Sequence, residues 1–258
     1  MSDKEISVNR IRIGKDKLSV IPDDERSFLF MLGHIGNELS ILQKLQWYAS
    51  NYDYPAETIA DHVHTSQMLM VAKLLVAKEK EAWDFIRTIF LSTPLGKIYV
   101  PLLTSDGKAA LDSLKAYFGK GTFIDNVRNE FAFHYLTDGW SNRLTAVYNK
   151  IEEGECVFYV SKSRANTHWY GAEVVVNYAL LETVQVDEPA KAMDRLIDDS
   201  LNVAAWLTTF VDHCIVAIVQ KHLGFEFVNK QMEPITIRSA PNPRNVSVPF
   251  FVQVPEKF

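Results

Sequence analysis

The chain has 258 residues, of which 47% are hydrophobic and 23% are charged, so it can bury the core of one large domain or two smaller ones. Its formal net charge of -5 excludes the overall basic excess that proteins binding nucleic acid unselectively usually carry. Any phosphate-binding site must therefore be local.

The composition also bears on where the protein works. Its two cysteines, Cys156 and Cys214, form no CxxC or Cys/His pattern typical of zinc sites, which favours a reducing compartment. The N-terminus lacks the apolar stretch of a secretory signal. The longest apolar run, which begins at Leu201, carries Asp212 and His213 near its middle, and this favours a buried helix over a membrane span. We expect a cytoplasmic protein without membrane contact.

The N-terminal third of the chain changes from strand-like to helical patterns. Residues 1–22 contain two alternating stretches around a Gly-Lys-Asp-Lys turn, which predicts an N-terminal extension with a short β-hairpin. Residues 22–51 begin with proline and acidic residues and repeat apolar side chains at helical spacing, and Pro55 opens a second such segment through Leu91. Two long helices are predicted here.

Prolines and glycines between residues 92 and 107 interrupt the helical pattern, and Ser105 or Asp106 is expected to cap a third helix through Phe118. Thr122 is then expected to cap a helix through Leu136. A break at Gly139 divides this helix from a further helical piece.

The last part of the chain contains a short β-like stretch, an ambiguous apolar segment and a long helix. The segment 168–184 has three consecutive valines, and its length favours a helix over a strand. Pro189 begins the last long helix, and Gly224 ends it. The predicted organisation is an extension at 1–22, a helical domain at 23–225 and an extended proline-rich strap at 226–258. The fold class is mainly α, a bundle of long helices with short β segments at both ends.

The stretch FIDNVRNEFAFHYL, residues 123–136, combines an apolar helix face with polar groups at its edges. Arg128 and His134 lie about 120° apart on an ideal α-helix, so they converge only at a helix break or across a symmetry axis. Spacing alone favours a histidine in the core and an arginine on the surface. An ion pair between that arginine and the nearby glutamate would contribute little stability.

The run Arg128, Asn129, four further residues and His134 resembles the arginine, polar residue and histidine signature of the HEPN superfamily, a group of helical nucleotide-binding and ribonuclease domains. The resemblance covers this motif in detail and residues 23–225 only as a helical pattern. It implies a homodimeric, metal-independent endoribonuclease without a cofactor, with two motif helices facing each other across a cleft.

The chemistry of these side chains fits that implication. His134 can act as general acid or base near neutral pH, and Arg128 can contact phosphate through two nitrogens. Asn129 would orient the phosphate or a neighbouring side chain, and Glu130 could hold the imidazole of His134. A polar contact within the helix is the alternative for Glu130.

Three further cationic or titratable side chains, Lys162, Arg164 and His168, lie in an expected loop and are candidate RNA contacts, although a solvated connection is the alternative. The expected partners are RNA or a nucleotide, and an antitoxin-like protein. A non-catalytic dimerisation or nucleotide-binding module is the main alternative. A helical-bundle metal protein is a weaker one, based on residues 34–38 and 61–64, because no Glu-x-x-His occurs in the sequence.

Overall fold

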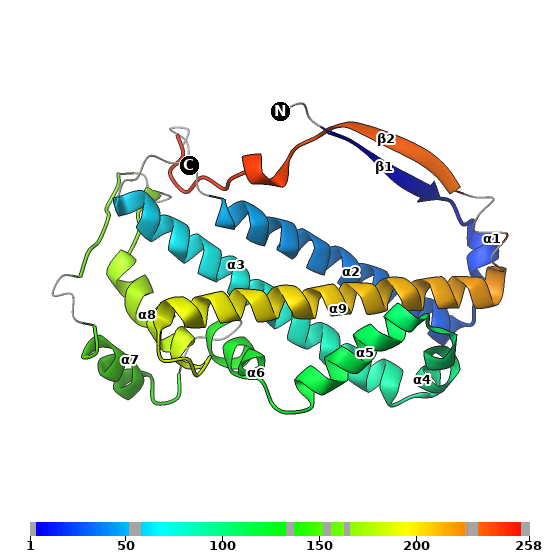
Figure 1. Cartoon of the computed structure of the whole chain (residues 1–258), viewed down its shortest axis with the longest axis horizontal. Helices are drawn as coiled ribbons and strands as arrows, with labels where there is room; N and C mark the ends of the chain where they lie inside the picture. The colour runs from blue at the N-terminus through cyan, green and yellow to red at the C-terminus, as the bar shows by residue number, and fades with distance from the viewer. Residues whose placement is uncertain are drawn as a thin grey trace. The chain divides into compact units, whose positions relative to one another are not determined.

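The computed structural model describes residues 4–51, 58–132, 137–151, 156–162, 166–224, 226 and 232–253 (Figure 1). Helices make up 71% of these residues, and two strands from opposite ends of the chain form a small antiparallel sheet. The predicted mainly α-helical fold with short terminal β segments is therefore confirmed.

Three long helices dominate the fold, and the first and the last of them begin where the sequence supplies a start signal. The helix α2 (Asp23–Ser50) follows Pro22 and opens with three acidic residues, which the positive end of a helix favours. The helix α3 (Thr58–Phe85) continues into a π-helical turn at Ile86–Leu91, and α9 (Pro189–Leu223) begins with proline. Shorter helices lie between them: α1 (Lys15–Leu18), α4 (Pro94–Tyr99), α5 (Ser105–Phe118), α6 (Phe123–Val127), α7 (Trp140–Tyr148) and α8 (Tyr170–Glu182).

Two details of the predicted helices are corrected by the structure. The interruption at 92–107 contains α4, whose N-terminus is capped by the hydroxyl of Thr93. Thr104, and neither Ser105 nor Asp106, caps α5, because its side chain accepts a hydrogen bond from the backbone N–H of Gly107 at 3.2 Å. The helical assignment of 168–184 is confirmed by α8, and Gly224 ends α9 with a positive φ of 81°.

The chain folds as two compact units, each assembled from three segments. The first unit contains Met1–Ile41, Lys78–Gly121 and Asn202–Asn245, and the second contains Leu42–Ala77, Thr122–Leu201 and Val246–Phe258. Three of their five boundaries fall inside α2, α3 and α9, and the other two follow Gly121 and Asn245. The domain limits 1–22, 23–225 and 226–258 stay a prediction.

An aromatic cluster forms the core of the first unit. The ring of Phe28 stacks on Phe85 and Phe90 at centroid distances of 5.9 and 5.4 Å, and Phe210 meets Phe90 edge-on at 5.3 Å. A side chain at Gly36 would place its Cβ 3.2 Å from Val211, so glycine permits the close approach of α2 and α9 within this unit.

The predicted N-terminal hairpin is wrong. The strand β1 (Lys4–Ile11) pairs antiparallel with β2 (Met232–Ala240), as Figure 1 shows, while Lys15–Leu18 forms the short helix α1. The β2 segment alternates apolar and polar residues from Ile235 to Arg238 and therefore offers β1 a longer matching partner than the nearby KLSVI stretch. We call this two-stranded sheet the β1–β2 ribbon.

Aliphatic side chains of the second unit pack around α6, α8 and the first half of α9. Ile124 and Val127 of α6, Leu180 of α8 and Leu196 of α9 are all fully buried. Among the described helices, α9 alone is long and apolar enough to cross a membrane by length and composition, a property that core helices of soluble proteins share.

Candidate functional site

The arginine and asparagine of the predicted motif lie on a π-helical turn. The helix α6 begins after Thr122, whose backbone N–H donates to Asp125 Oδ2 at 3.4 Å, so the predicted cap is confirmed. After Val127 the chain widens into a π-helical turn over Arg128–Ala132. We call this segment the motif turn. Such turns have i to i+5 hydrogen bonding and frequently mark functional sites.

Arg128 is half-buried, and Asn129 is exposed on the motif turn. The guanidinium of Arg128 donates from Nη1 to Asn129 Oδ1 at 2.8 Å, so Asn129 helps to orient the arginine. His134 falls in 133–136, outside the described residues. The separation of about 120° expected for Arg128 and His134 assumed an α-helix, and the π-helical turn changes that geometry before residue 134.

Arg143 of α7 anchors the motif turn. Its guanidinium pairs with the carboxylate of Glu130, lies 5.1 Å from the ring centroid of Phe131, and donates to the backbone carbonyl of Ala179 at 3.1 Å. One cation therefore links the motif turn to α7 and to α8. Sequence spacing predicted a role for Glu130 beside His134 and gave no indication of Arg143 as its partner.

The three candidate RNA contacts have different settings. Lys162 is exposed, Arg164 falls outside the described residues, and His168 is 6% exposed. The backbone of His168 pairs with that of Tyr159 in an isolated antiparallel bridge, with both N–H to O distances at 2.8 Å. His168 therefore lies inside the second unit, whereas Lys162 is accessible to a large ligand.

Aromatic rings and imidazoles surround His168. His62 of α3 stacks on Tyr170 with ring centroids 3.5 Å apart, and its Nδ1 lies 2.9 Å from the hydroxyl of Tyr159. Burial lowers the pKa of His168, and the nearby His62 lowers it further, while Glu173 opposes the change. His168 is therefore largely neutral near pH 7.

Ser66 and His168 are close but are poorly arranged for nucleophilic catalysis. The two side chains lie 3.4 Å apart from Oγ to Nε2, and the hydroxyl of Ser66 donates to the backbone carbonyl of His62 at 3.0 Å. A serine activated by histidine must instead direct its proton at the imidazole. The geometry favours a structural hydrogen bond for this pair.

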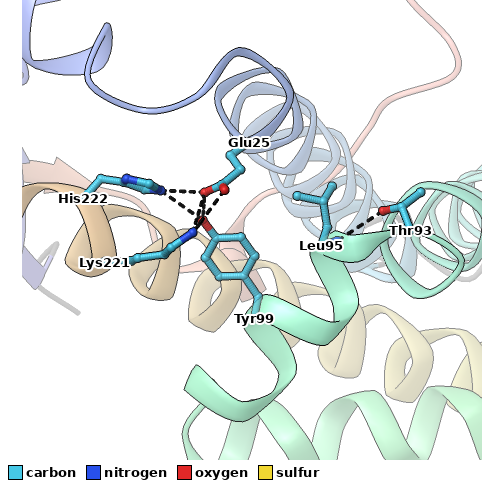
Figure 2. A network of polar contacts seen from close by, with 6 residues as sticks. All are labelled: Glu25, Thr93, Leu95, Tyr99, Lys221 and His222. Atoms are coloured by element: carbon cyan, nitrogen blue, oxygen red, sulfur yellow. Dashed lines mark hydrogen bonds and ion pairs between the residues drawn. The ribbon is translucent and has the colours of Figure 1, made fainter.

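A second polar cluster lies in the first unit, and Figure 2 shows it around the carboxylate of Glu25. His222 Nε2 lies 2.5 Å from Glu25 Oε2, and Lys221 Nζ lies 3.0 and 3.1 Å from the two carboxylate oxygens. The hydroxyl of Tyr99 donates to the same carboxylate. The cluster joins the first turn of α2 to the end of α4 and the last turn of α9.

The charges of this cluster match the ends of its helices. Burial alone would raise the pKa of Glu25, but hydrogen bonds from Tyr99, His222 and Lys221 and the charge of Lys221 hold it below 4.5. Burial and the adjacent Glu25 raise the pKa of Tyr99. An anion at a helix N-terminus and cations at a C-terminus are both stabilising. The cluster therefore links the N-terminus of α2 to the C-termini of α4 and α9.

Metal binding was a weaker prediction for this chain. Within the described residues, no three His, Cys, Asp or Glu side chains are grouped as a metal site requires. His34 and Glu38 of the predicted metal motif form an ion pair at 3.6 Å, and Glu38 also pairs with Lys78 at 2.8 Å.

Comparisons with known proteins give no assignment. Neither a protein family, nor a curated protein, nor a solved structure matches this chain. Any function therefore has to be argued from the residues themselves.

The sequence analysis did not single out Lys73 of α3, a buried charged group that interacts with Glu173. Lys73 is 9% exposed, and burial lowers its pKa while Glu173 opposes the change. A sequence signal existed, because Lys73 interrupts the apolar run from Met68 to Ala77. A charge within such a run needs a compensating group nearby in the fold.

Proposed function

We propose that the protein is a cytoplasmic, HEPN-like, metal-independent endoribonuclease that acts as a homodimer through Arg128 and His134. The observation that carries the proposal is the setting of Arg128 on the motif turn. Its guanidinium is oriented by Asn129, and the motif turn is fixed by the ion pair between Glu130 and Arg143. An oriented guanidinium can stabilise the negative charge that develops on a phosphate.

The chemistry uses the nucleophile that RNA itself carries. The 2′-hydroxyl attacks the adjacent phosphorus, the new O2′–P bond forms, and the P–O5′ bond breaks. One imidazole accepts the proton of the 2′-hydroxyl, and a second protonates the leaving 5′-oxygen. A two-fold axis supplies both imidazoles as the two copies of His134, and the two copies of Arg128 hold the phosphorane.

The dimer has a candidate contact surface in the β1–β2 ribbon. Ile6 and Val8 of β1 pair with Ile237 and Ile235 of β2 on one face. All four side chains are exposed, by 47, 46, 43 and 36% respectively. Exposed β-branched residues on an isolated two-stranded ribbon favour burial against a second copy.

The test is cleavage of a fluorescent single-stranded RNA by purified wild-type protein and by His134→Ala and Arg128→Ala variants. Loss of the general acid and base should lower the rate by about 100-fold or more. Loss of Arg128 should have a similar effect, because the phosphorane charge loses its donor. Arg87→Ala is the matched control, because Arg87 is an exposed arginine paired with Asp84 in the other unit.

Two further arms test the proposed chemistry. Chelation of metals should leave the rate unchanged, and an RNA with 2′-deoxy sugars should not be cut. Equal cleavage by the wild type and both motif variants would refute the proposal. An inactive wild-type dimer that still binds RNA would instead favour the non-catalytic module. Inhibition of cleavage by an antitoxin-like partner belongs to the catalytic proposal only.

A further inference from the structure

A cavity of about 230 Å³ lies in the second unit between α3, α8 and the start of α9. Its walls are mostly apolar, with Leu69, Val174, Leu181 and Met193 among them, and Tyr170 and Tyr178 add aromatic surface. We call it the α3–α8 pocket. Because pockets for drug-sized ligands start at about 300 Å³, this one suits a single ring or a small bicyclic compound.

Two polar side chains, Glu173 and Asn177, line the pocket one helical turn apart on α8. Asn177 Nδ2 donates to Glu173 Oε2 at 3.0 Å, which orients the amide. Asn177 is 7% exposed, and its Oδ1 has no hydrogen-bond partner among the described residues. A buried carbonyl without a donor is unfavourable, so this atom marks the place where a donor is missing.

Asn177 Oδ1 and the carboxylate of Glu173 are acceptors, so a ligand that pairs with them must supply N–H or O–H donors. The hydroxyl of Ser66, which also lines the pocket, already donates to the carbonyl of His62. A flat ligand with an NH2 group can direct one N–H to Glu173, and the other to Asn177 once a rotation of its amide brings the buried Oδ1 to the pocket wall. Its ring would then contact the apolar and aromatic walls.

The neighbouring charges favour a neutral ligand over a cation. Lys73 of α3 is buried and lies close enough to Glu173 for the two charges to interact. The ammonium therefore offsets the carboxylate, and a cationic ligand would add a second buried positive charge beside Lys73. A neutral NH2 group donates hydrogen bonds without that cost.

We propose that the α3–α8 pocket binds a small, neutral, flat ring compound whose conjugated NH2 group donates to Asn177 Oδ1 and to Glu173. Aromatic primary amides and amino-substituted heterocycles, including free nucleobases, share this chemistry. The proposal is independent of RNA cleavage, because it involves neither Arg128 nor His134.

The test uses the full chain and measures binding by calorimetry and ligand-observed NMR. Benzamide and 9-methyladenine are the two neutral probes. Benzamidine has nearly the shape of benzamide but carries a positive charge, and N,N-dimethylbenzamide lacks the N–H donors. We expect at least one neutral probe to bind, and both modified benzamides to bind about tenfold more weakly than benzamide. Failure of both neutral probes, or tighter binding of benzamidine, would overturn the proposal.

The Asn177→Leu variant separates the hydrogen bond from the general shape of the pocket. It should weaken the better neutral probe about tenfold and leave the weak binding of N,N-dimethylbenzamide unchanged. Asn149→Leu, at an exposed position after α7, is the matched control and should bind like the wild type. Val174→Trp should abolish binding by filling the pocket. If Asn177→Leu keeps full affinity for the neutral probe while remaining folded, the proposed contact is absent.

Discussion

The carboxylate of Glu25 lies in the first turn of α2 and accepts hydrogen bonds from side chains of α4 and α9 (Figure 2). Only 11% of its side chain is exposed, so water solvates it poorly. Tyr99, Lys221 and His222 therefore replace that water as partners. Removing the charge leaves these partners without an acceptor of equal strength, and the cost appears as lost stability.

We expect Glu25→Gln to lower the free energy of unfolding by about 1–3 kcal/mol, because buried partners lose a charged acceptor. Urea unfolding at neutral pH measures this value. Tyr99→Phe removes one hydrogen bond but no charge, and it should cost less than Glu25→Gln. Equal stability of Glu25→Gln and the wild type would show that the cluster does not fasten the helix ends.

The same carboxylate predicts an acid dependence. The pKa of Glu25 is lower in the folded protein than its ordinary value of 4.5, so the unfolded chain binds its proton more readily. The contribution of Glu25 is complete above 4.5 and is lost as pH falls through the lower folded-state pKa. Unfolding measured between neutral pH and this range should therefore show a smaller acid-induced loss in Glu25→Gln than in the wild type. Identical pH profiles would contradict this prediction.

At the residue scale, sequence spacing identified neighbours on one helix but no partners on other helices. The capping role of Thr122 and the adjacency of Arg128 and Asn129 depend on local sequence, and they could be predicted. The partners of Glu25 are 74 to 197 residues away. Such contacts depend on tertiary packing, which helical periodicity does not report.

At the scale of elements, the long helices were predictable because their ends carry local signals. Pro22 with its acidic followers, Pro189 and Gly224 mark helix ends through backbone constraints that act over a few residues. The motif turn has no comparable sequence signal, because a π-helical turn uses the same residue types as an α-helix. The pairing of β1 with β2 was also beyond local reasoning, since the two strands lie at opposite ends of the chain.

The β1–β2 ribbon gives a prediction about association. We expect Val8→Thr combined with Ile235→Thr to weaken homodimerisation by about tenfold or more, because buried aliphatic surface would be replaced by hydroxyl groups. Threonine keeps the β-branched shape that strands favour, so the ribbon should still form. Sedimentation equilibrium over a concentration series measures the change.

The opposite face of the β1–β2 ribbon supplies the control. Ser7 and Thr236 pair there, and Ser7→Ala combined with Thr236→Ala should leave the dimer unchanged. If both pairs of substitutions have the same effect, or if the wild type is monomeric throughout, the aliphatic face is not the dimer contact.

At the scale of the whole molecule, three of the five unit boundaries lie where sequence composition gives no warning. These three fall between Ile41 and Leu42, between Ala77 and Lys78, and between Leu201 and Asn202, within continuous helices, whereas the other two follow Gly121 and Asn245. A boundary inside a helix has no proline, glycine or polar linker to mark it. Composition allowed either one large core or two smaller ones, and the chain forms two compact units.

Because the net charge of the chain is -5, a phosphate-binding site must be local and make few phosphate contacts. The last prediction therefore concerns how salt affects RNA binding. For single strands, each phosphate contact contributes about -0.7 to the slope of log K against log salt concentration. Arg128 and the exposed Lys162 from both protomers would make four contacts, so the expected slope is about -2.8. Binding should be measured with His134→Ala protein, because this variant should not cut the RNA. Adding Arg128→Ala or Lys162→Ala should make the slope shallower by about 1.4 in each case, whereas Arg87→Ala should not change it. A slope several times steeper would mean that a broad basic surface binds the RNA, and the local site argued from Arg128 would then be the wrong one.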